Sequence, residues 1–303
     1  MTHHHSHHNH SSSHYNRAFA IGIVLNIGFV IVETVYGFLA HSIALLADAG
    51  HNSSDVLSLV LAWGASLLSQ QKPTHRYTYG LRGSSILVSL TNAILLLLAM
   101  GAIGLESVQR FGYPEPIAGR TVITVAVVGI LVNTITALLF MSGRQHDLNI
   151  RGAFLHMAAD AGVSAGVVLA GIAIVLTGWQ WVDPVVSLVV VVVVVIGTWQ
   201  LLKDSLNLAL NAVPEGIEPL AVRTFLEERP GVTQVHDLHI WAMSTTETAL
   251  TVHLVMPEGH PGDDFLQQLC DQLHRHFGVD HSTIQIEVGD SLHICALAPD
   301  HIV

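Results

Sequence analysis

Six long apolar blocks fill the first two thirds of the sequence, and each approaches or exceeds the roughly 20 residues that a helix needs to cross a bilayer. The connections between them are short and carry proline, glycine and charge. Half of the 303 residues are apolar, 12% are charged, and the mean hydropathy is +0.52. This composition and pattern predict a polytopic α-helical membrane protein. The blocks run approximately over Ala18–Leu39, Ser42–Leu68, Ser84–Val108, Thr121–Met141, Gly152–Leu176 and Pro184–Leu202.

The positions of lysine and arginine near the block ends predict the orientation in the membrane. With the N-terminus in the cytosol, seven of these residues fall inside, and only Arg110 and Arg120 fall outside. We therefore expect both termini to be cytosolic. The polar start of the chain does not resemble a cleavable signal peptide, so the first apolar helix is expected to direct insertion. The seven inside residues are Arg17, Lys72, Arg76, Arg82, Arg144, Arg151 and Lys203.

The formal charge of −11 belongs entirely to the last third of the chain. Residues 1–208 hold nine basic and nine acidic residues, whereas the remainder holds three basic and fourteen acidic residues. This acidic surplus argues against nucleic acid as a partner and favours cationic ligands. The two cysteines, Cys270 and Cys295, form no C-x-x-C pair, so neither a disulfide framework nor a thiolate metal cage is expected.

After Lys203 the pattern becomes that of a soluble domain. It predicts a helix, two strands, a second helix and a third strand, which together suit a small α+β (αββαβ) sandwich. A domain of this size would gain stability from dimerisation or from a bound metal. The expected elements are the helices Pro214–Arg229 and Asp263–Phe277 and the strands Val232–Met243, Thr248–Met256 and Ser282–Val288.

The chain is thus expected to have four parts: a His-rich flexible segment (1–16), a six-helix transmembrane domain (17–205), a cytosolic metal-sensing domain (209–290) and a C-terminal tail (291–303). An expression tag and plain disorder are alternatives for the first segment, and a low-affinity metal-collecting arm is its functional interpretation. Its histidines are His3, His4, His5, His7, His8, His10 and His14.

Two copies of the pattern His-x-x-x-Asp lie inside apolar blocks, at His51–Asp55 and His156–Asp160. Residues four apart share a helix face, so each pair presents an imidazole beside a carboxylate. Two such helices facing each other supply two nitrogens and two oxygens, enough for a tetrahedral divalent metal. A water-facing helix edge is the alternative, but ionisable groups are rare in membranes and usually mark a substrate path. The second pair lies nearer its block's cytosolic end, so the two helices must be offset or the site forms in only one conformation.

Imidazole ligands favour a borderline ion such as Zn²⁺ over magnesium or manganese. Metal and protons compete for these ligands, and histidine titrates near neutrality. One site with two mutually exclusive occupants is the chemistry of a metal/proton antiporter. Three further polar residues in the apolar blocks, Asn26, Glu33 and Asn133, are expected to be interhelical hydrogen-bond partners or groups supporting the ligands.

These motifs resemble the zinc-transporting branch of the cation diffusion facilitator family, of the bacterial zinc/cadmium efflux type. The resemblance rests on HSIALLADAGHNSSD from His41, HMAAD from His156, Asp183–Pro184, HDLHIW from His236, TVHLVM from Thr251 and HSTIQIE from His281. It implies a homodimeric Zn²⁺/H⁺ antiporter of the bacterial inner membrane, with six spans and a cytosolic ferredoxin-like domain. It places the transport site at His51, Asp55, His156 and Asp160, with cadmium as a secondary ion.

The resemblance also implies a regulatory metal site in the cytosolic domain at His236, His253 and His281, with Glu287 as a further ligand. The three histidines fall on or beside the predicted strands and so have a route to converge. His75, in the loop 70–83, is either a ligand of another site or an ordinary loop residue.

Two other classes of protein are considered. An intramembrane metalloenzyme would need an activated water and a base, typically on an H-E-x-x-H helix, and the sequence contains no such motif. A membrane metal sensor would need no ligands at bilayer depth. A transporter of Co²⁺, Fe²⁺ or Mn²⁺ remains an alternative cargo assignment, and no enzyme activity is expected.

Overall fold

The computed structural model describes residues 12–69, 72–141, 148–289, 295 and 297. It divides into two compact units, each described separately below. The first combines residues 1–60 with 92–200, and the second combines residues 61–91 with 201–303.

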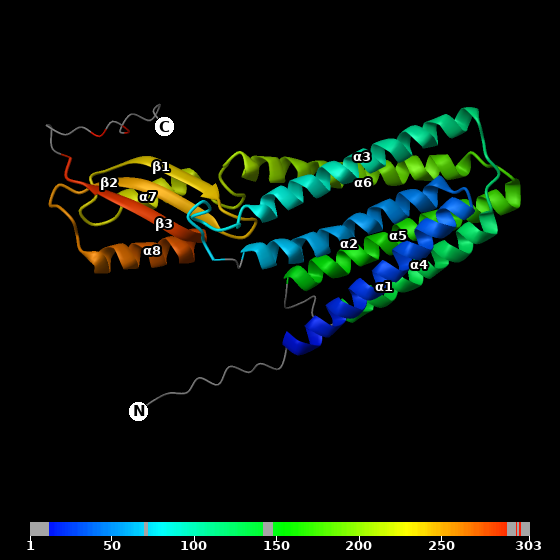
Figure 1. Ribbon diagram of the computed structural model, residues 1–303, viewed down its shortest axis with the longest axis horizontal. Helices are drawn as coiled ribbons and strands as arrows, with labels where there is room; N and C mark the ends of the chain where they lie inside the picture. Colours follow the sequence, from blue (N-terminus) through cyan, green and yellow to red (C-terminus); the bar gives the residue numbers. More distant parts are fainter. Residues whose placement is uncertain (1–11, 70–71, 142–147, 290–294, 296, 298–303) are drawn as a thin grey trace. The chain divides into compact units, whose positions relative to one another are not determined.

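Six long helices account for the six apolar blocks (Figure 1). By length and composition, four described stretches are able to cross a membrane, namely Ser84–Gly112, Gly119–Leu139, Phe154–Thr177 and Val182–Ala209. Ile23–Leu39 is a shorter apolar stretch. The full helices are α1 (Ser12–Leu39), α2 (Ile43–Ser69), α3 (Ser84–Gly112), α4 (Gly119–Phe140), α5 (Leu148–Thr177) and α6 (Val182–Ala209).

Four boundaries of these six helices differ from the expected ones by four residues or more, including the end of α3 at Gly112 instead of Val108. α1 begins at Ser12, so residues 12–16, which were assigned to a flexible segment, are helical. α5 begins at Leu148 instead of Gly152, and α6 continues to Ala209, beyond the expected domain end at 205. Helix propagation past an apolar block is easy once the helix is nucleated, which explains these extensions. Residues 1–11 and most of the expected C-terminal tail lie outside the described residues.

In the first unit, the helices pack through the close approach of small residues and through an apolar core. α4 and α5 pack along each other (Figure 1), and a Cβ on Gly171 would lie 2.7 Å from Ile123 Cγ1. Small residues allow such close helix packing in a bilayer. Phe29, Leu45, Val122 and Val167 are buried in the core that joins α1, α2, α4 and α5.

A carboxylate from another helix caps the start of α2. Asp183, at the start of α6, is fully buried and accepts hydrogen bonds from the backbone N–H of Ile43 (2.7 Å) and of Ala44 (3.3 Å). The hydroxyl of Ser42 donates to its other oxygen. Free N–H groups in a helix's first turn favour a negative charge, so Asp183 fixes where α2 begins.

The second unit contains a three-stranded mixed sheet with the predicted order of elements. These elements are α7 (Pro219–Glu227), β1 (Gln234–Ala242), β2 (Thr248–Val255), α8 (Asp263–Phe277) and β3 (Val279–Glu287). β1 pairs antiparallel with β2, and β2 pairs parallel with β3 through the α8 crossover (Figure 1). Leu226, Leu250, Leu254 and Leu273 are fully buried in the core. β3 begins three residues earlier than predicted because Gly278, with φ +68°, ends α8 in a tight left-handed turn.

Candidate metal sites

The four predicted transport ligands come together from α2 and α5. One ligand atom from each of His51, Asp55, His156 and Asp160 lies within 4.8 Å of all the others. His51 Nε2 is 3.2 Å from Asp160 Oδ1, and His156 Nε2 is 3.1 Å from Asp55 Oδ2. The pairs along each helix are slightly wider, at 3.8 Å for His51–Asp55 and 3.7 Å for His156–Asp160.

These separations suit a small tetrahedral ion. With metal–ligand bonds of about 2.1 Å, the ligand atoms of a tetrahedral zinc lie about 3.4 Å apart. Oδ2 of Asp55 and Oδ2 of Asp160 are buried and, among the described residues, have no hydrogen-bond partner outside this group of four. Their lone pairs are therefore available to a cation.

The two helices are offset where the pairs meet. Asp55 lies near the middle of α2, whereas His156 lies about two turns from the start of α5. The sequence alone allows either offset helices or a site that forms in only one conformation. The structure has the offset arrangement.

Exposure changes steadily along the site. The side chains of His156 and Asp55 are 43% and 30% exposed, whereas those of His51 and Asp160 are 19% and 2% exposed. The first two residues lie toward the start of α5 and the end of α2. The site is therefore open at that end and closed at the other.

A second group of metal-binding side chains lies in the soluble domain. His236 on β1, His253 on β2 and Glu287 on β3 form it together with Cys295. His253 Nδ1 lies 2.9 Å from Glu287 Oε1 and 3.6 Å from Cys295 Sγ, and His236 Nε2 lies 3.4 Å from Glu287 Oε2. His236 is 3% exposed, and neither of its ring nitrogens has a hydrogen-bond partner among the described residues.

The sheet register explains which histidines meet. His236 pairs directly with His253 across β1 and β2, so their side chains share one face. His239 instead bonds Asp237, at 2.9 Å, beyond an irregularity between residues 236 and 239. The structure does not bring His281 to this group. His281 is the third residue of β3, opposite Ala249, and six residues of strand, about 20 Å, separate it from Glu287. The ring of His281 packs edge-on against Tyr79.

Cys295 is the ligand candidate that the sequence analysis missed. The sequence has no C-x-x-C pair and so predicts no thiolate metal cage. A single thiol beside two imidazoles and a carboxylate is nonetheless a suitable zinc donor set. The only signal in the sequence was its position a few residues beyond Glu287.

The remaining predicted ligands join no group. His75 is exposed in the loop before α3 and belongs to no cluster of three or more metal-binding side chains within the described part of the chain. The N-terminal histidines up to His10 lie outside the described residues, and the side chain of His14 is not described.

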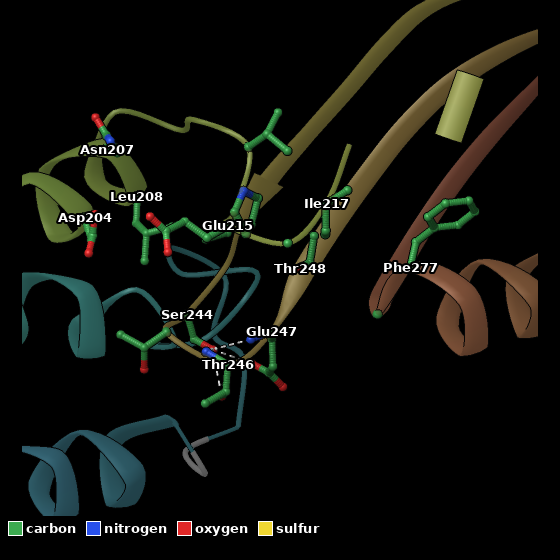
Figure 2. Close-up of a pocket in the computed structure, with 16 residues that line it drawn as sticks. Asp204, Asn207, Leu208, Glu215, Ile217, Ser244, Thr246, Glu247, Thr248 and Phe277 are labelled. Carbon is green, nitrogen blue, oxygen red and sulfur yellow. Dashed lines mark hydrogen bonds between the residues drawn. The ribbon is translucent and has the colours of Figure 1, made fainter. Parts of the chain in front are cut away.

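A cavity of about 460 Å³ lies in the second unit, and none of the residues of that unit's metal-binding group lines it (Figure 2). The β1–β2 turn lines it, with Ser244 accepting hydrogen bonds from the backbone N–H of Thr246 and Glu247. Glu247 also pairs with Arg82 at 2.7 Å. The polar side chains that line the cavity are therefore accounted for by hydrogen bonds within the turn and by this ion pair, and no ligand is needed to explain them.

Comparison with known proteins identifies the kind of chain that carries these two groups. Residues 19–208 match the model of the cation efflux transmembrane domain. Residues 214–288 match the model of the cation efflux protein cytoplasmic domain. The chain belongs to the cation efflux family. This confirms the family resemblance seen in the sequence and the expectation of a transporter rather than an enzyme.

Curated members of the cation efflux family are similar along nearly the whole chain. One is the "Cadmium, cobalt and zinc/H(+)-K(+) antiporter" of Bacillus subtilis, 34% identical over 92% of this chain and 91% of its own. Another is the "Zinc transporter ZitB" of Escherichia coli, 36% identical over 92% of this chain and 91% of its own. A third is the "Metal cation efflux system protein CzcD" of Cupriavidus metallidurans, 34% identical over 90% of this chain and 87% of its own.

Proposed function

We propose that this cation efflux protein exports Zn²⁺ from the cytosol in exchange for H⁺, and that its transport site consists of His51, Asp55, His156 and Asp160. The observation that carries the proposal is the convergence of these four side chains within 4.8 Å, from two apolar helices. Ionisable groups at such depth are disfavoured unless they serve a substrate. Four ligands leave no open coordination position for an activated water.

Zinc is the cargo that the donor set favours. Two imidazoles and two carboxylates at near-tetrahedral spacing suit an ion without geometric preference from its d electrons. The named substrates of the relatives include zinc, and cadmium and cobalt appear beside it in the Bacillus name. Cadmium is accordingly a secondary cargo.

Proton exchange follows from the same ligands. Carboxylates and imidazoles bind metal only when deprotonated, so each zinc that binds displaces protons, and each proton that returns weakens zinc binding. The Bacillus relative is named for H⁺ and K⁺ exchange, and H⁺ is the ion that these side chains can carry.

The topology and assembly belong to the proposal as well. Six spans with both termini cytosolic place the start of α5 and the end of α2 on the cytosolic side. The open end of the site then faces the cytosol. A bacterial inner membrane, a ferredoxin-like cytosolic fold and a homodimer complete the assignment.

The soluble group is proposed to sense zinc. His236, His253, Glu287 and Cys295 supply a second donor set, while His281 is left out by its distance. The acidic tails of two subunits repel each other, and bound cations would relieve that repulsion. Spectroscopic labels on the two tails should approach when zinc is added, and an unchanged separation would refute the sensing role.

Reconstituted vesicles test the transport site directly. Asp55→Asn and Asp160→Asn should each reduce zinc-dependent proton flux to background, since each replaces a charged, protonatable carboxylate by a neutral amide of the same shape. Glu106→Gln is the matched control, because Glu106 is an exposed carboxylate of α3 that pairs with Arg110. Flux retained in either aspartate variant would overturn the site, and zinc binding without flux in the parent chain would favour the membrane sensor.

A further inference from the structure

Two buried carboxylates that ligate nothing lie beside the transport site. Glu33 on α1 and Asp48 on α2 are both fully buried. Asp48 lies one helical turn before His51, toward the closed end of the site. Burying a charge in a membrane helix is costly, so two such residues need a physical explanation.

One amide and one hydroxyl connect these carboxylates to the neighbouring helices. The Nδ2 of Asn52 donates to Glu33 Oε2 at 3.1 Å and to Asp48 Oδ1 at 3.5 Å. The hydroxyl of Ser164, on α5, donates to Asp48 Oδ2 at 3.1 Å. Glu33 and Asp48 are also close enough to hydrogen-bond to each other. The network therefore joins α1, α2 and α5 one turn beyond the metal ligands.

The two carboxylates are not equally satisfied. Both oxygens of Asp48 accept a hydrogen bond, as an ionised carboxylate requires. Glu33 Oε1 is buried and has no hydrogen-bond partner among the described residues. A buried acceptor without a partner is destabilising, and two ionised carboxylates sharing one amide would repel each other. A proton on Glu33 removes both problems, since an O–H can donate to Asp48.

A metal ion fits this place poorly. Hard cations take six or more oxygen ligands, whereas here an N–H and an O–H donor already occupy three of the four carboxylate oxygens. The single free oxygen, Glu33 Oε1, suits one proton.

We propose that Glu33, together with Asp48, binds one exchangeable proton at a site separate from the four zinc ligands. The inference rests on the proposed transport function, because zinc at the ligands is what displaces this proton. A divalent charge one helical turn away favours the ionised pair, so the proton leaves when zinc arrives. The proton forms an O–H bond on one carboxyl oxygen and departs to water or to a proton-accepting side chain.

The surrounding charges are few. His51 on α2 and Asp160 on α5 interact electrostatically with Asp48. Asp160 also interacts electrostatically with Glu33. α4 lies against this region through Gly129, and its only ionisable residue is Arg120 in its first turn. Zinc binding at the ligands is therefore the main change in charge that Glu33 experiences.

The test counts protons released per zinc bound. Zinc titrations of the purified full-length protein by calorimetry, in buffers of different ionisation enthalpy, give this number together with the affinity. Glu33→Gln keeps the shape and a carbonyl oxygen for Asn52, so the four ligands should still bind zinc while proton release falls by about one per zinc. Because coupling between zinc and this proton is reciprocal, zinc affinity should fall as well and become less dependent on pH. Glu106→Gln should change neither, and the contribution of the soluble domain cancels in the difference.

The outcomes separate the inference from the transport assignment. Unchanged proton release in Glu33→Gln would overturn the proton site while leaving the four ligands in place. Unchanged zinc binding in Asp55→Asn would overturn the ligands instead. Should Glu33→Gln fail to fold, infrared spectra of the unaltered chain provide the test: zinc should remove a protonated-carboxyl band, and Asp48→Asn should shift that band. Absence of the band refutes the inference.

Discussion

The carboxylate that caps α2 offers a quantitative test of how the transport site is positioned. Replacing Asp183 by alanine removes the acceptor for the backbone N–H groups of Ile43 and Ala44 and for the Ser42 hydroxyl. These groups lie in the buried start of the helix that carries His51 and Asp55. The perturbation is therefore remote from the metal ligands but acts on the helix that holds two of them.

The magnitude follows from the number of bonds lost. Hydrogen bonds to a charged group contribute about 1.5–3 kcal/mol each, and the two backbone bonds together give about 3–6 kcal/mol. The loss of stability is smaller where the helix start relaxes or water reaches the freed N–H groups. Its lower limit is then the largest loss typical of a deleted helix cap, about 2 kcal/mol. We expect Asp183→Ala to destabilise the protein by about 2–5 kcal/mol and to weaken zinc binding as α2 shifts.

Thermal unfolding in detergent, together with zinc titration, measures both effects. Ser42→Ala is the control, because it leaves the two backbone bonds to Asp183 in place and removes only the bonds of the Ser42 hydroxyl, which donates to Asp183 and accepts from the backbone N–H of Leu45 at 3.2 Å. Its loss of stability should be clearly smaller. An Asp183→Ala protein with the unfolding midpoint and zinc affinity of the parent chain would refute the idea that this carboxylate positions α2.

Two further predictions concern the soluble domain. Cys295→Ser should weaken zinc binding in this domain by at least about tenfold, since a hydroxyl is a poorer zinc ligand than a thiolate. Cys270→Ser, on α8, should leave zinc binding unchanged. Calorimetry on the full chain measures both affinities, and equal affinities would exclude Cys295 as a ligand. Leu273→Ala should destabilise the domain by about 2–5 kcal/mol because this side chain is fully buried, while Leu220→Ala, 68% exposed on α7, should cost far less in thermal unfolding.

The convergence of the four proposed transport ligands was predictable because their spacing is local. His51 and Asp55 share a face of any helix that contains them, as do His156 and Asp160, so only the pairing of the two helices remained to be found. Glu33 was expected to bond across helices, and its bond to Asn52 confirms this. Its missing second partner was beyond prediction, because it depends on how three helices pack.

The soluble site was less predictable because it depends on register. The predicted third strand began at Ser282, beside His281, whereas in the structure His281 is the third residue of β3 and lies six residues before Glu287. What required the observed pairing was that His236 lies directly opposite His253. Cys295 lies outside any periodic element, so nothing in the pattern linked it to His253. Strand periodicity specifies a face, whereas position along the sheet comes from pairing with neighbouring strands.

The gradient of exposure along α2 and α5 connects the two proposals. Access to the ligands narrows from His156 to Asp160, and beyond Asp160 the structure closes with Asp48, Ser164 and Glu33, which are all fully buried. A cargo that enters at the open end can leave at the other only if the hydrogen bonds among these three residues and Asn52 separate. The proposed proton on Glu33 supplies a physical trigger: once zinc displaces it, two ionised carboxylates repel each other across one amide, and the closed end is weakened when the cargo is in place.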